Sequence, residues 1–214
     1  MVLTEDFVFP DPEEALDSGL LAVGGDLQPE RLLLAYRSGI FPWYDNKPIL
    51  WWSPDPRMVL YPKNFRLSKS LRRTLNKNVF DFSFNKAFDE VIRHCAEVRR
   101  SYQKEHATWI TSEMIEAYSE LHKAGHAMSV EVWKEEKLVG GLYGIDLPEK
   151  KIFCGESMFS LVSDASKAAL YHLCEYVMKK NYQLIDCQLY SKHLASMGGE
   201  LISRGDFLKY LNRG

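Results

Sequence analysis

Three consecutive strand-like segments, followed by a long helix and another strand, constrain the fold of this 214-residue chain most strongly. The segments cover 128–134, 137–145 and 151–154, and short turns at 135–136 and 147–149 separate them. Turns of this length favour antiparallel hairpins. Helical periodicity follows over 165–180, and a strand is predicted over 182–188. The order predicts an antiparallel meander, a crossover helix and a final strand parallel to the third one.

Further elements are predicted on both sides of this unit. Helices are expected at 85–99, at 112–123, from residue 191 and from residue 206, with a strand at 200–203. The first sixty residues are instead rich in Pro, Gly and Trp, with short helices expected near 12–19 and 29–39. Pro48, Pro54 and Pro56 exclude regular helix around them. We therefore predict an α+β protein with a small Pro/Trp-rich N-terminal domain, 1–60, and a second domain, 61–214.

Several classes of protein are excluded by composition or lack a supporting motif. No apolar run approaches the roughly 20 residues of a membrane-spanning helix. The acidic first twelve residues do not form a signal peptide, which favours a cytoplasmic protein. The four scattered cysteines are expected to be reduced and to pack as small apolar groups. No zinc spacing, Walker loop or dinucleotide motif occurs, so no metal and no cofactor are predicted.

Charge is concentrated in one segment. Residues 1–56 carry a net charge of −7, whereas residues 57–80 contain seven bases and no acid. A helix capped by Ser68 would run to about residue 78 and turn its leucines, Leu71 and Leu75, inward. Its opposite face carries four bases: Lys69, Arg72, Arg73 and Lys77. Such a face is either simply solvated or contacts a polyanion, and the absence of any compensating acid favours RNA phosphates.

The predicted meander and crossover helix are similar to the fold of N-acetyltransferase-like (GNAT) acyltransferases. In that fold two parallel strands diverge, and the acyl group and the amine meet in the gap; here these strands would be 151–154 and 184–188. GNAT enzymes hold acetyl-CoA through a glycine-rich turn before the helix. The corresponding stretch, 156–164, contains no glycine, so the usual acyl carrier is not indicated.

Polar residues at the predicted strand ends are candidates for chemistry. Asp186 and Gln188 are two residues apart on one strand and should share a face, and Glu156 should lie just beyond the neighbouring strand. Together they would suit an amine or a cationic ligand. The alternative is that these are solvated strand-end residues. Trp51 and Trp52 could likewise face a ligand, but packing in a small core is the favoured interpretation.

Several segments together make the chain resemble the leucyl/phenylalanyl-tRNA–protein transferase family. They run in order along the chain: 19–27, 39–43, 49–57, 108–110, 129–133, 138–144, 153–160, 164–167 and 184–188. The resemblance implies an aminoacyltransferase, more specifically a leucyltransferase. Such an enzyme moves leucine or phenylalanine, and less readily methionine, from aminoacyl-tRNA to the α-amine of a protein beginning with Arg or Lys. The product would be marked for N-end-rule degradation.

The resemblance also implies roles for individual residues. Trp43 and Trp109 would hold the terminal adenosine of the tRNA, since an aromatic ring stacks well on a base. An apolar pocket would take the aminoacyl side chain: Leu142, Phe153, Met158, Leu173 and Ile185. Asp186 would orient and polarise Gln188, and either Asp186 or Glu156 would pair with the Arg or Lys cation.

Two other function classes remain possible from the sequence. An acetyl-CoA-dependent N-acetyltransferase would share the fold, but the missing glycine-rich turn opposes it. A non-catalytic RNA-binding protein would use the basic helix, but it would leave Glu156, Asp186 and Gln188 without a role.

Overall fold

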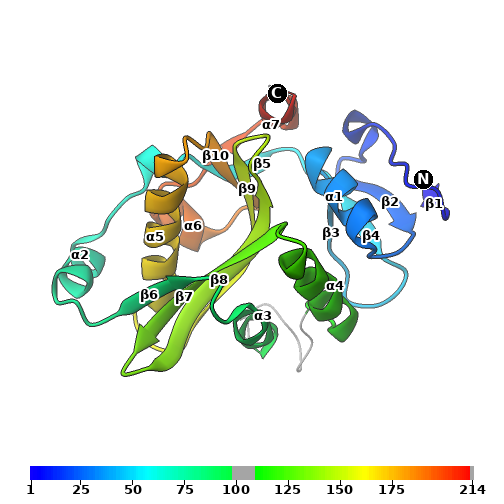
Figure 1. Cartoon of the computed structure of the whole chain (residues 1–214). Coiled ribbons are helices and arrows are strands. Elements are labelled where there is room, and N and C mark those ends of the chain that lie inside the picture. The colour runs from blue at the N-terminus through cyan, green and yellow to red at the C-terminus, as the bar shows by residue number, and fades with distance from the viewer. Residues whose placement is uncertain (98–108, 213–214) are drawn as a thin grey trace.

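The structure is a computed structural model that describes residues 1–97 and 109–212 (Figure 1). Within these residues the strands form a four-stranded sheet, ordered β1-β2-β4-β3, and a seven-stranded sheet, ordered β11-β5-β10-β9-β8-β7-β6. The small sheet consists of β1 (Val2–Leu3), β2 (Leu20–Gly24), β3 (Phe41–Pro42) and β4 (Leu50–Trp52). The large sheet consists of β5 (Arg57–Leu60), β6 (Asp81–Phe84), β7 (Ala127–Lys134), β8 (Lys137–Leu147), β9 (Ile152–Ser160), β10 (Leu184–Gln188) and β11 (Glu200–Ile202).

The large sheet has the predicted arrangement at its centre. Strands β7, β8 and β9 form an antiparallel meander, and β10 returns parallel to β9. The turn at Glu135 and Glu136 has positive φ at both residues, as a tight hairpin requires. The helix α5 (Ala165–Lys179) makes the crossover between β9 and β10. The α+β fold class with a GNAT-like second part is therefore confirmed.

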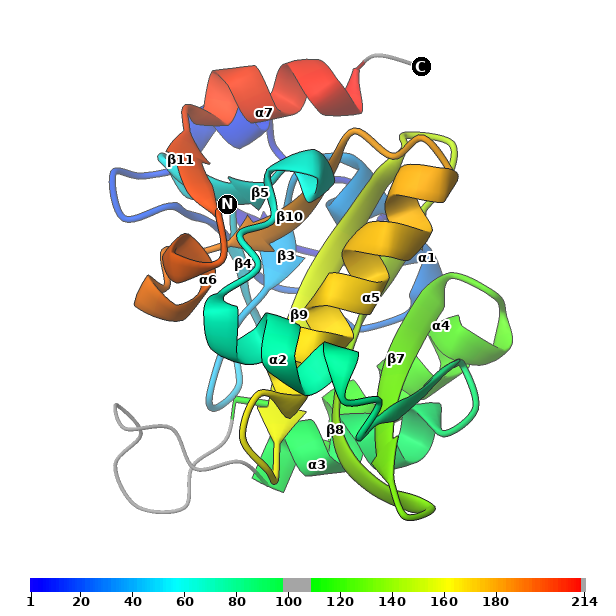
Figure 2. The same cartoon turned by 90° about the vertical axis from the view of Figure 1, so that its left-hand side faces the viewer.

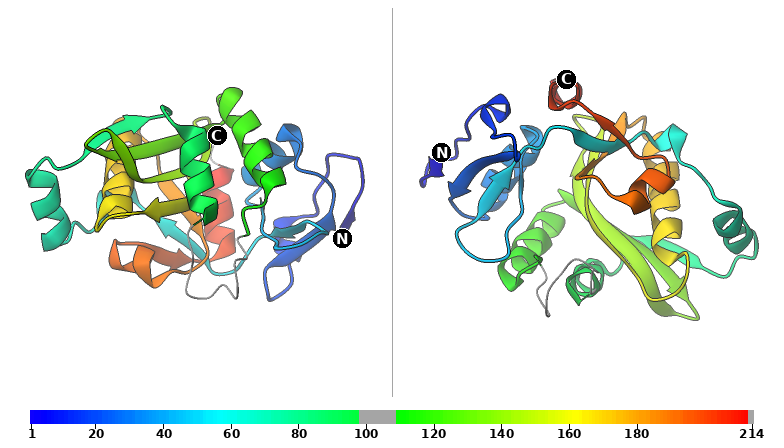
Figure 3. Two further views of the ribbon diagram at one scale, coloured as in Figure 1. Left: turned by 90° about the horizontal axis from the view of Figure 1, so that it is seen from below. Right: turned by 180° about the vertical axis from the view of Figure 1, so that it is seen from behind.

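Helices cover both faces of the large sheet. Helix α5 packs on β7, β8 and β9 from one side, and α3 (Phe88–Glu97) and α4 (Ser112–Lys123) pack on the other side (Figure 1). Helix α4 also contacts α1 (Pro29–Arg37), so it lies between the large sheet and the small one (Figure 3). Short helices complete the fold: η1 (Pro12–Glu14), η2 (Pro62–Asn64), α2 (Lys69–Asn76), α6 (Lys192–Ser196) and α7 (Arg204–Leu211).

Gly39 joins the N-terminal region to the C-terminal helix. It follows α1 with φ of +78°, a conformation that favours glycine. A Cβ atom at this position would lie 2.9 Å from Cδ2 of Leu208, so a larger residue would push α7 away. The close approach lets α7 pack directly on the turn between α1 and β3.

The packing prediction for the tryptophans of β4 holds. Trp51 is fully buried, and its indole N–H donates to the carbonyl oxygen of Gly24 at 2.8 Å. Trp52 is half-buried and donates to the carbonyl oxygen of Trp43 at 2.7 Å. Both rings therefore stabilise the small sheet. Cys95, Cys154 and Cys174 are also buried, as expected for thiols that pack as small apolar groups.

Several predicted elements differ from the structure. Strand β9 was expected to end at Cys154 but continues to Ser160, because β8 pairs with it through Gly140 and Ser160. The helix expected at 85–99 begins only at Phe88, since Asn85 has φ of +59° and its side chain accepts the N–H of Ser129. The predicted end of that helix, Arg99, lies outside the described residues. The helix expected near 12–19 is only the short η1, because the backbone becomes extended at Ala15, and the strand expected over 182–188 begins at Leu184. None of the strands β1 to β6 was predicted.

The two sheets share a hydrophobic core. One cluster of buried side chains runs from the small sheet through α1 and α4 to the large sheet, and a second lies between α5 and the large sheet. Strand β5 pairs with β10 and β11, so residues 57–60 belong to the large sheet. The proposed division into domains 1–60 and 61–214 stays a prediction. No helix in the described residues is long and apolar enough to cross a membrane.

Candidate active site

A cavity of about 800 Å³ opens where β9 and β10 separate. The parallel pairing of these strands covers only Ile152–Cys154 on β9 and Leu184–Asp186 on β10. Beyond this point β9 continues along β8, while β10 ends and the chain turns toward α6. The divergence that the fold predicts is thus present, and the cavity lies next to it.

A bulge in the β8–β9 pair shapes the strand beside the cavity. The register shifts between Tyr143 and Gly144, and Gly144 pairs with Gly155. A Cβ atom on Gly144 would lie 2.2 Å from the carbonyl oxygen of Cys154, so this position requires glycine. Bulges of this kind turn a strand and re-aim its side chains. Tyr143 pairs with Ser157 and Gly144 with Gly155, so Glu156 is the extra residue of the bulge and has no partner on β8.

The cavity brings together most of the predicted site residues. The following predicted site residues line it: Trp43, Trp109, Leu142, Phe153, Glu156, Met158, Leu173, Ile185 and Gln188. Sequence reasoning missed Phe41, Tyr143 and Leu170 in the same lining. The signal for Leu170 was available, because it precedes Leu173 by three residues on the predicted helix.

Asp186 does not line the cavity. It is fully buried, and its two carboxylate oxygens accept hydrogen bonds from Nε and Nη2 of Arg57 at 2.8 and 2.7 Å. The prediction that Asp186 and Gln188 share a face is therefore wrong. The register of β10 shifts between them, and Gln188 has φ of +55°, so simple strand alternation does not apply.

Asp186 reaches Gln188 through the backbone instead. The N–H of Gln188 donates to Oδ1 of Asp186 at 3.0 Å, while the side-chain amide of Gln188 donates to Glu156 at 3.4 Å. Asp186 thus fixes the position of the Gln188 backbone. Its charge is balanced by Arg57 in a buried ion pair.

Arg57 is a residue that the sequence interpretation grouped with the exposed basic segment. In the structure it is buried, and its guanidinium lies 4.9 Å from the Phe41 ring centroid and 4.6 Å from that of Phe207. Its remaining nitrogen donates to the carbonyl oxygen of Gly39 at 3.1 Å. Its place directly after Pro54, Asp55 and Pro56 was the only sequence signal that set it apart.

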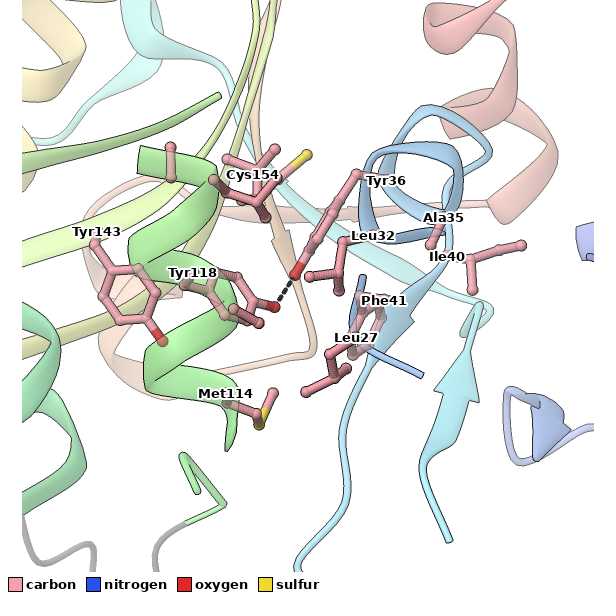
Figure 4. Close-up of a cluster of buried hydrophobic side chains, with 14 of the residues drawn as sticks. Leu27, Leu32, Ala35, Tyr36, Ile40, Phe41, Met114, Tyr118, Tyr143 and Cys154 are labelled. Carbon is pink, nitrogen blue, oxygen red and sulfur yellow. Dashed lines mark hydrogen bonds between the residues drawn. The ribbon is translucent and has the colours of Figure 1, made fainter. Parts of the chain in front are cut away.

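Glu156 is the carboxylate that lines the cavity, and two tyrosines hold it. The hydroxyl of Tyr118 donates to its Oε2 at 3.2 Å, and the hydroxyls of Tyr118 and Tyr36 are hydrogen-bonded to each other (Figure 4). Tyr36 comes from α1 and Tyr118 from α4, so groups from three parts of the fold meet here. Both tyrosines lie on the buried face of their helix, so the sequence pattern indicates only their burial and not their contact with Glu156.

Burial raises the pKa of Glu156 to about 8. The hydroxyls of Tyr36 and Tyr118 oppose this rise, the Asp186 carboxylate adds to it, and the Arg57 cation reduces it. Burial and the Glu156 charge also raise the pKa values of both tyrosines well above their usual range, so they act as hydrogen-bond donors. A carboxyl group that titrates near neutral pH can accept a proton from an amine and later release it.

The two cavity tryptophans differ in exposure. Trp43 follows β3 and is 37% exposed, whereas Trp109 directly precedes α4 and is 7% exposed. Trp43 packs edge-on against Trp52, with ring centroids 5.7 Å apart. Both rings can contact a ligand in the cavity, but Trp109 also belongs to the hydrophobic core.

The basic helix forms as predicted. The Ser68 hydroxyl accepts the N–H of Leu71 at 3.1 Å, and Leu71 is buried. Four side chains on the other face are exposed: Lys69, Arg72, Arg73 and Lys77. Helix α2 lies beside α5, whose Leu170 and Leu173 line the cavity (Figure 2). Within residues 1–97 and 109–212, no group of three potential metal ligands lies together.

Comparisons with known proteins agree with this geometry. Residues 59–212 match the family model of leucyl/phenylalanyl-tRNA protein transferase, and residues 25–55 match the model of its N-terminal domain. The chain is 56% identical to the leucyl/phenylalanyl-tRNA–protein transferase of Flavobacterium johnsoniae, over 98% of this chain and 97% of that protein. It is 57% identical to the protein of the same name from Syntrophobacter fumaroxidans, over 98% of this chain and 88% of that one.

A solved structure, L-PGS from Bacillus licheniformis, shares 11% identity with a TM-score of 0.45, over 82% of this chain and 57% of that one. That similarity is too low to bear on function. The sequence relatives and the family models show the family of this chain, since they cover nearly all of it. The chain therefore belongs to the leucyl/phenylalanyl-tRNA protein transferase family and is an aminoacyltransferase.

Proposed function

We propose that this enzyme transfers leucine or phenylalanine, and less readily methionine, from aminoacyl-tRNA to the α-amine of proteins that begin with Arg or Lys. The observation that carries the proposal is the lining of one cavity, which combines two indole rings, an apolar wall and one acidic side chain, Glu156, with the basic side chains of Lys192 and His193. The products would be marked for N-end-rule degradation. Because the donor is a charged tRNA, we infer that the reaction takes place in the cytoplasm.

The donor binds along the apolar side of the cavity. The terminal adenosine stacks between the surfaces of Trp43 and Trp109, and the aminoacyl side chain enters the apolar wall. That wall consists of Leu142, Phe153, Met158, Leu170, Leu173 and Ile185. Apolar pockets discriminate a single methylene group by only about 1–3 kcal/mol. Leucine, phenylalanine and methionine should therefore be used with graded rates rather than exclusively.

The acceptor amine binds near Glu156 and Gln188. The Arg57 cation already neutralises Asp186, so Glu156 is the acid available to a basic N-terminus. A nearby opposite charge lowers the pKa of a carboxyl group. Since the pKa of Glu156 is about 8 in the empty site, binding of an Arg or Lys side chain would convert Glu156 to its ionised form. The preference for basic N-termini would thus be coupled to activation of the base.

The chemistry is aminolysis of an ester that is already activated. The α-amine attacks the ester carbonyl carbon, a tetrahedral oxyanion forms, and the C–O bond to the ribose breaks. Glu156 takes the proton that the amine loses and returns it to the ribose oxygen, which leaves as a hydroxyl. A free α-amine has a pKa of about 7.7–8.0, so roughly a tenth or more of the acceptor is already neutral at pH 7 and no strong base is needed.

Gln188 and Asp186 have supporting roles in this scheme. The side-chain amide of Gln188 is not basic, but it can donate a hydrogen bond to the oxyanion or accept one from the amine. Asp186 is a positioning residue, because it accepts the backbone N–H of Gln188 and fixes the strand end. Helix α2 with Lys69, Arg72, Arg73 and Lys77 contacts phosphates of the acceptor stem.

The test is a transfer assay with leucyl-tRNA that carries labelled leucine. We expect label in a peptide that begins with Arg or Lys, and little in the same peptide beginning with Ala or acetylated at its N-terminus. Acetyl-CoA with the Arg peptide tests the N-acetyltransferase alternative. Binding of leucyl-tRNA without any labelled peptide would contradict the proposal and support a non-catalytic RNA-binding protein.

A further inference from the structure

A second hollow lies on the other side of α5 from the catalytic cavity. It has a volume of about 380 Å³, and residues in or next to α2, β6 and α5 line it. Figure 2 shows α2 beside α5. Tyr171 and His172 line it, whereas Leu170 and Leu173 of the same helix line the catalytic cavity. An α-helix is about 10–12 Å across, so the two cavities are separated by little more than one helix.

The floor of this hollow is aromatic. The rings of Phe82 and His172 lie 3.5 Å apart between centroids and are tilted by 33°, and Phe80 packs edge-on against Phe82 at 6.5 Å. Burial, together with the Lys179 cation, lowers the pKa of His172 to about 4. The imidazole is therefore neutral near pH 7. A neutral aromatic floor suits stacking of a flat ring rather than binding of a bare anion.

The rim of the hollow is polar and belongs to the basic helix. Arg72, Thr74 and Asn76 line it from α2, and Asn78 lines it just after that helix. Amide side chains can donate and accept hydrogen bonds along the edge of a base, and Arg72 supplies a cation. Arg72 is also part of the exposed basic face, so the hollow and the phosphate-binding surface are continuous.

We propose that this hollow binds an unpaired nucleotide of the donor tRNA, with the base on the aromatic floor and its edge at Asn76 and Asn78. This inference rests on the proposed use of aminoacyl-tRNA as donor. A single strand whose terminal adenosine lies in the catalytic cavity passes over α5 to reach α2, where the acceptor stem binds. The hollow lies on that route, and stacked aromatic rings with polar edges are the usual means of holding an unstacked base.

The kinetic test compares donors of increasing length with variants of α2. Loss of a hydrogen bond at the rim should cost about two- to tenfold in kcat/KM. Asn76→Ala should therefore weaken the use of full leucyl-tRNA by this factor, while its effect on leucyl-adenosine stays smaller than twofold. Leu75→Trp, which fills the hollow instead of emptying it, should act in the same direction. Ser70→Ala on the same helix is the matched control, because Ser70 is exposed and outside the hollow.

A charge-matched pair separates the hollow from the phosphate contact. Arg72→Ala and Arg73→Ala remove the same charge from one helix, but only Arg72 lines the hollow. Both should reduce the salt dependence of tRNA binding equally, and Arg72→Ala should raise the Kd further. Equal Kd values for the two variants, with Asn76→Ala identical to Ser70→Ala on every donor, would overturn the inference.

A crosslinking experiment locates the nucleotide directly. A photoreactive 4-thiouridine is placed at one unpaired position of the tRNA 3′ end at a time. At one position we expect crosslinks to the peptide with Phe80 and Phe82 or to the peptide with Tyr171. Crosslinks confined to other segments would contradict the inference. If the wild-type enzyme transfers leucine from no donor at all, the proposed function fails instead, and the two failures are thus distinguishable.

Discussion

The charged groups at the catalytic cavity are buried, whereas those on the basic face of α2 are exposed to solvent. Behind the cavity, Arg57 and Asp186 form a buried bidentate ion pair, and two tyrosine hydroxyls hold Glu156. On α2, the four cations Lys69, Arg72, Arg73 and Lys77 are exposed. In the part of the chain that the structure describes, no carboxylate forms an ion pair with them.

This difference determines which measured properties a substitution in each region should change. Buried charges interact strongly because little water screens them, so they affect stability and titrate at unusual pH. Exposed cations are screened within about 10 Å at 0.1 M salt and contribute mainly to attraction of a polyanion. Changes in the cavity should therefore alter turnover, pH dependence or stability. Changes on α2 should alter the salt dependence of tRNA binding.

The largest effect is expected from Glu156→Gln. General base catalysis contributes about 10²–10⁴-fold, so kcat/KM for an Arg peptide should fall by that factor. Below pH 8 the wild-type log kcat/KM should rise with a slope approaching 2, because both Glu156 and the amine must lose a proton. In the variant the slope should fall toward 1. An unchanged slope measured across pH 6–9 would show that Glu156 is not the base.

Asp186→Ala should reduce turnover by about 10²-fold, since a displacement of a site residue by about 1 Å can cost this much. It should also leave Arg57 buried without its partner, which costs about 3–5 kcal/mol of stability. Asp186→Asn is the matched control and should lose less of both, because it keeps a hydrogen-bond acceptor. Thermal melts and initial rates measure the two effects. Normal turnover in folded Asp186→Ala would remove Asp186 from the mechanism.

Replacing either tryptophan by Ala should weaken donor binding to a similar extent, whereas the loss of stability should differ between the two variants. Either Trp→Ala change should raise the donor KM by about 5- to 150-fold, which corresponds to one stacked base. Trp109→Ala should also lower the Tm, because Trp109 belongs to the hydrophobic core, and Trp43→Ala should do so much less. Leucyl-adenosine is the appropriate donor for this measurement. A large fall in Tm with an unchanged donor KM would assign Trp109 to the core alone.

The effect on α2 should be moderate and confined to tRNA. Replacing Arg72 and Arg73 together by Ala should weaken tRNA binding and reduce the slope of log K against log salt by about 2 units at most. The pH profile and the Tm should stay close to those of the wild type. If leucyl-adenosine is affected as strongly as full tRNA, the helix supports the fold and does not bind the acceptor stem.

The smallest effect is a pH dependence of stability caused by Glu156. Its pKa is about 8 in the folded chain against an ordinary value of 4.5. Between about pH 5 and pH 8 the unfolded chain has lost this proton while the folded chain keeps it, so stability falls as pH rises. The decline should be steeper in the wild type than in Glu156→Gln. Parallel Tm-against-pH curves for the two proteins would contradict the raised pKa.

The central meander, α5 and β10 could be predicted from the sequence because their hydrophobic periods are regular and their turns are short. Strands β5 and β6 are short, four residues each, and β6 is an edge strand, so neither carries a distinctive pattern. Strand β9 was cut short because Gly155 and Glu156 interrupt its apolar run. Pairing with β8, which no local pattern encodes, extends it.

The composition of the cavity could be predicted, but its electrostatics could not. The apolar residues and the two tryptophans that the resemblance singled out line one cavity, and their roles stay predictions. The different surroundings of the two acids depend on Arg57, which pairs with Asp186 and lies 129 residues from it in the chain. Likewise, Tyr36 and Tyr118 meet only because α1 packs on α4. Residues so far apart along the chain form no local sequence pattern from which their contact could be predicted.

The Arg57 side chain has a consequence for how the protein unfolds. It connects Asp186 of β10, the turn at Gly39, the ring of Phe41 in the small sheet and the ring of Phe207 in α7. The Arg57 guanidinium therefore contacts residues of both sheets and of the C-terminal helix. Calorimetry should accordingly show one melting transition with equal calorimetric and van't Hoff enthalpies, and Arg57→Ala should lower its Tm because Asp186 loses its buried partner.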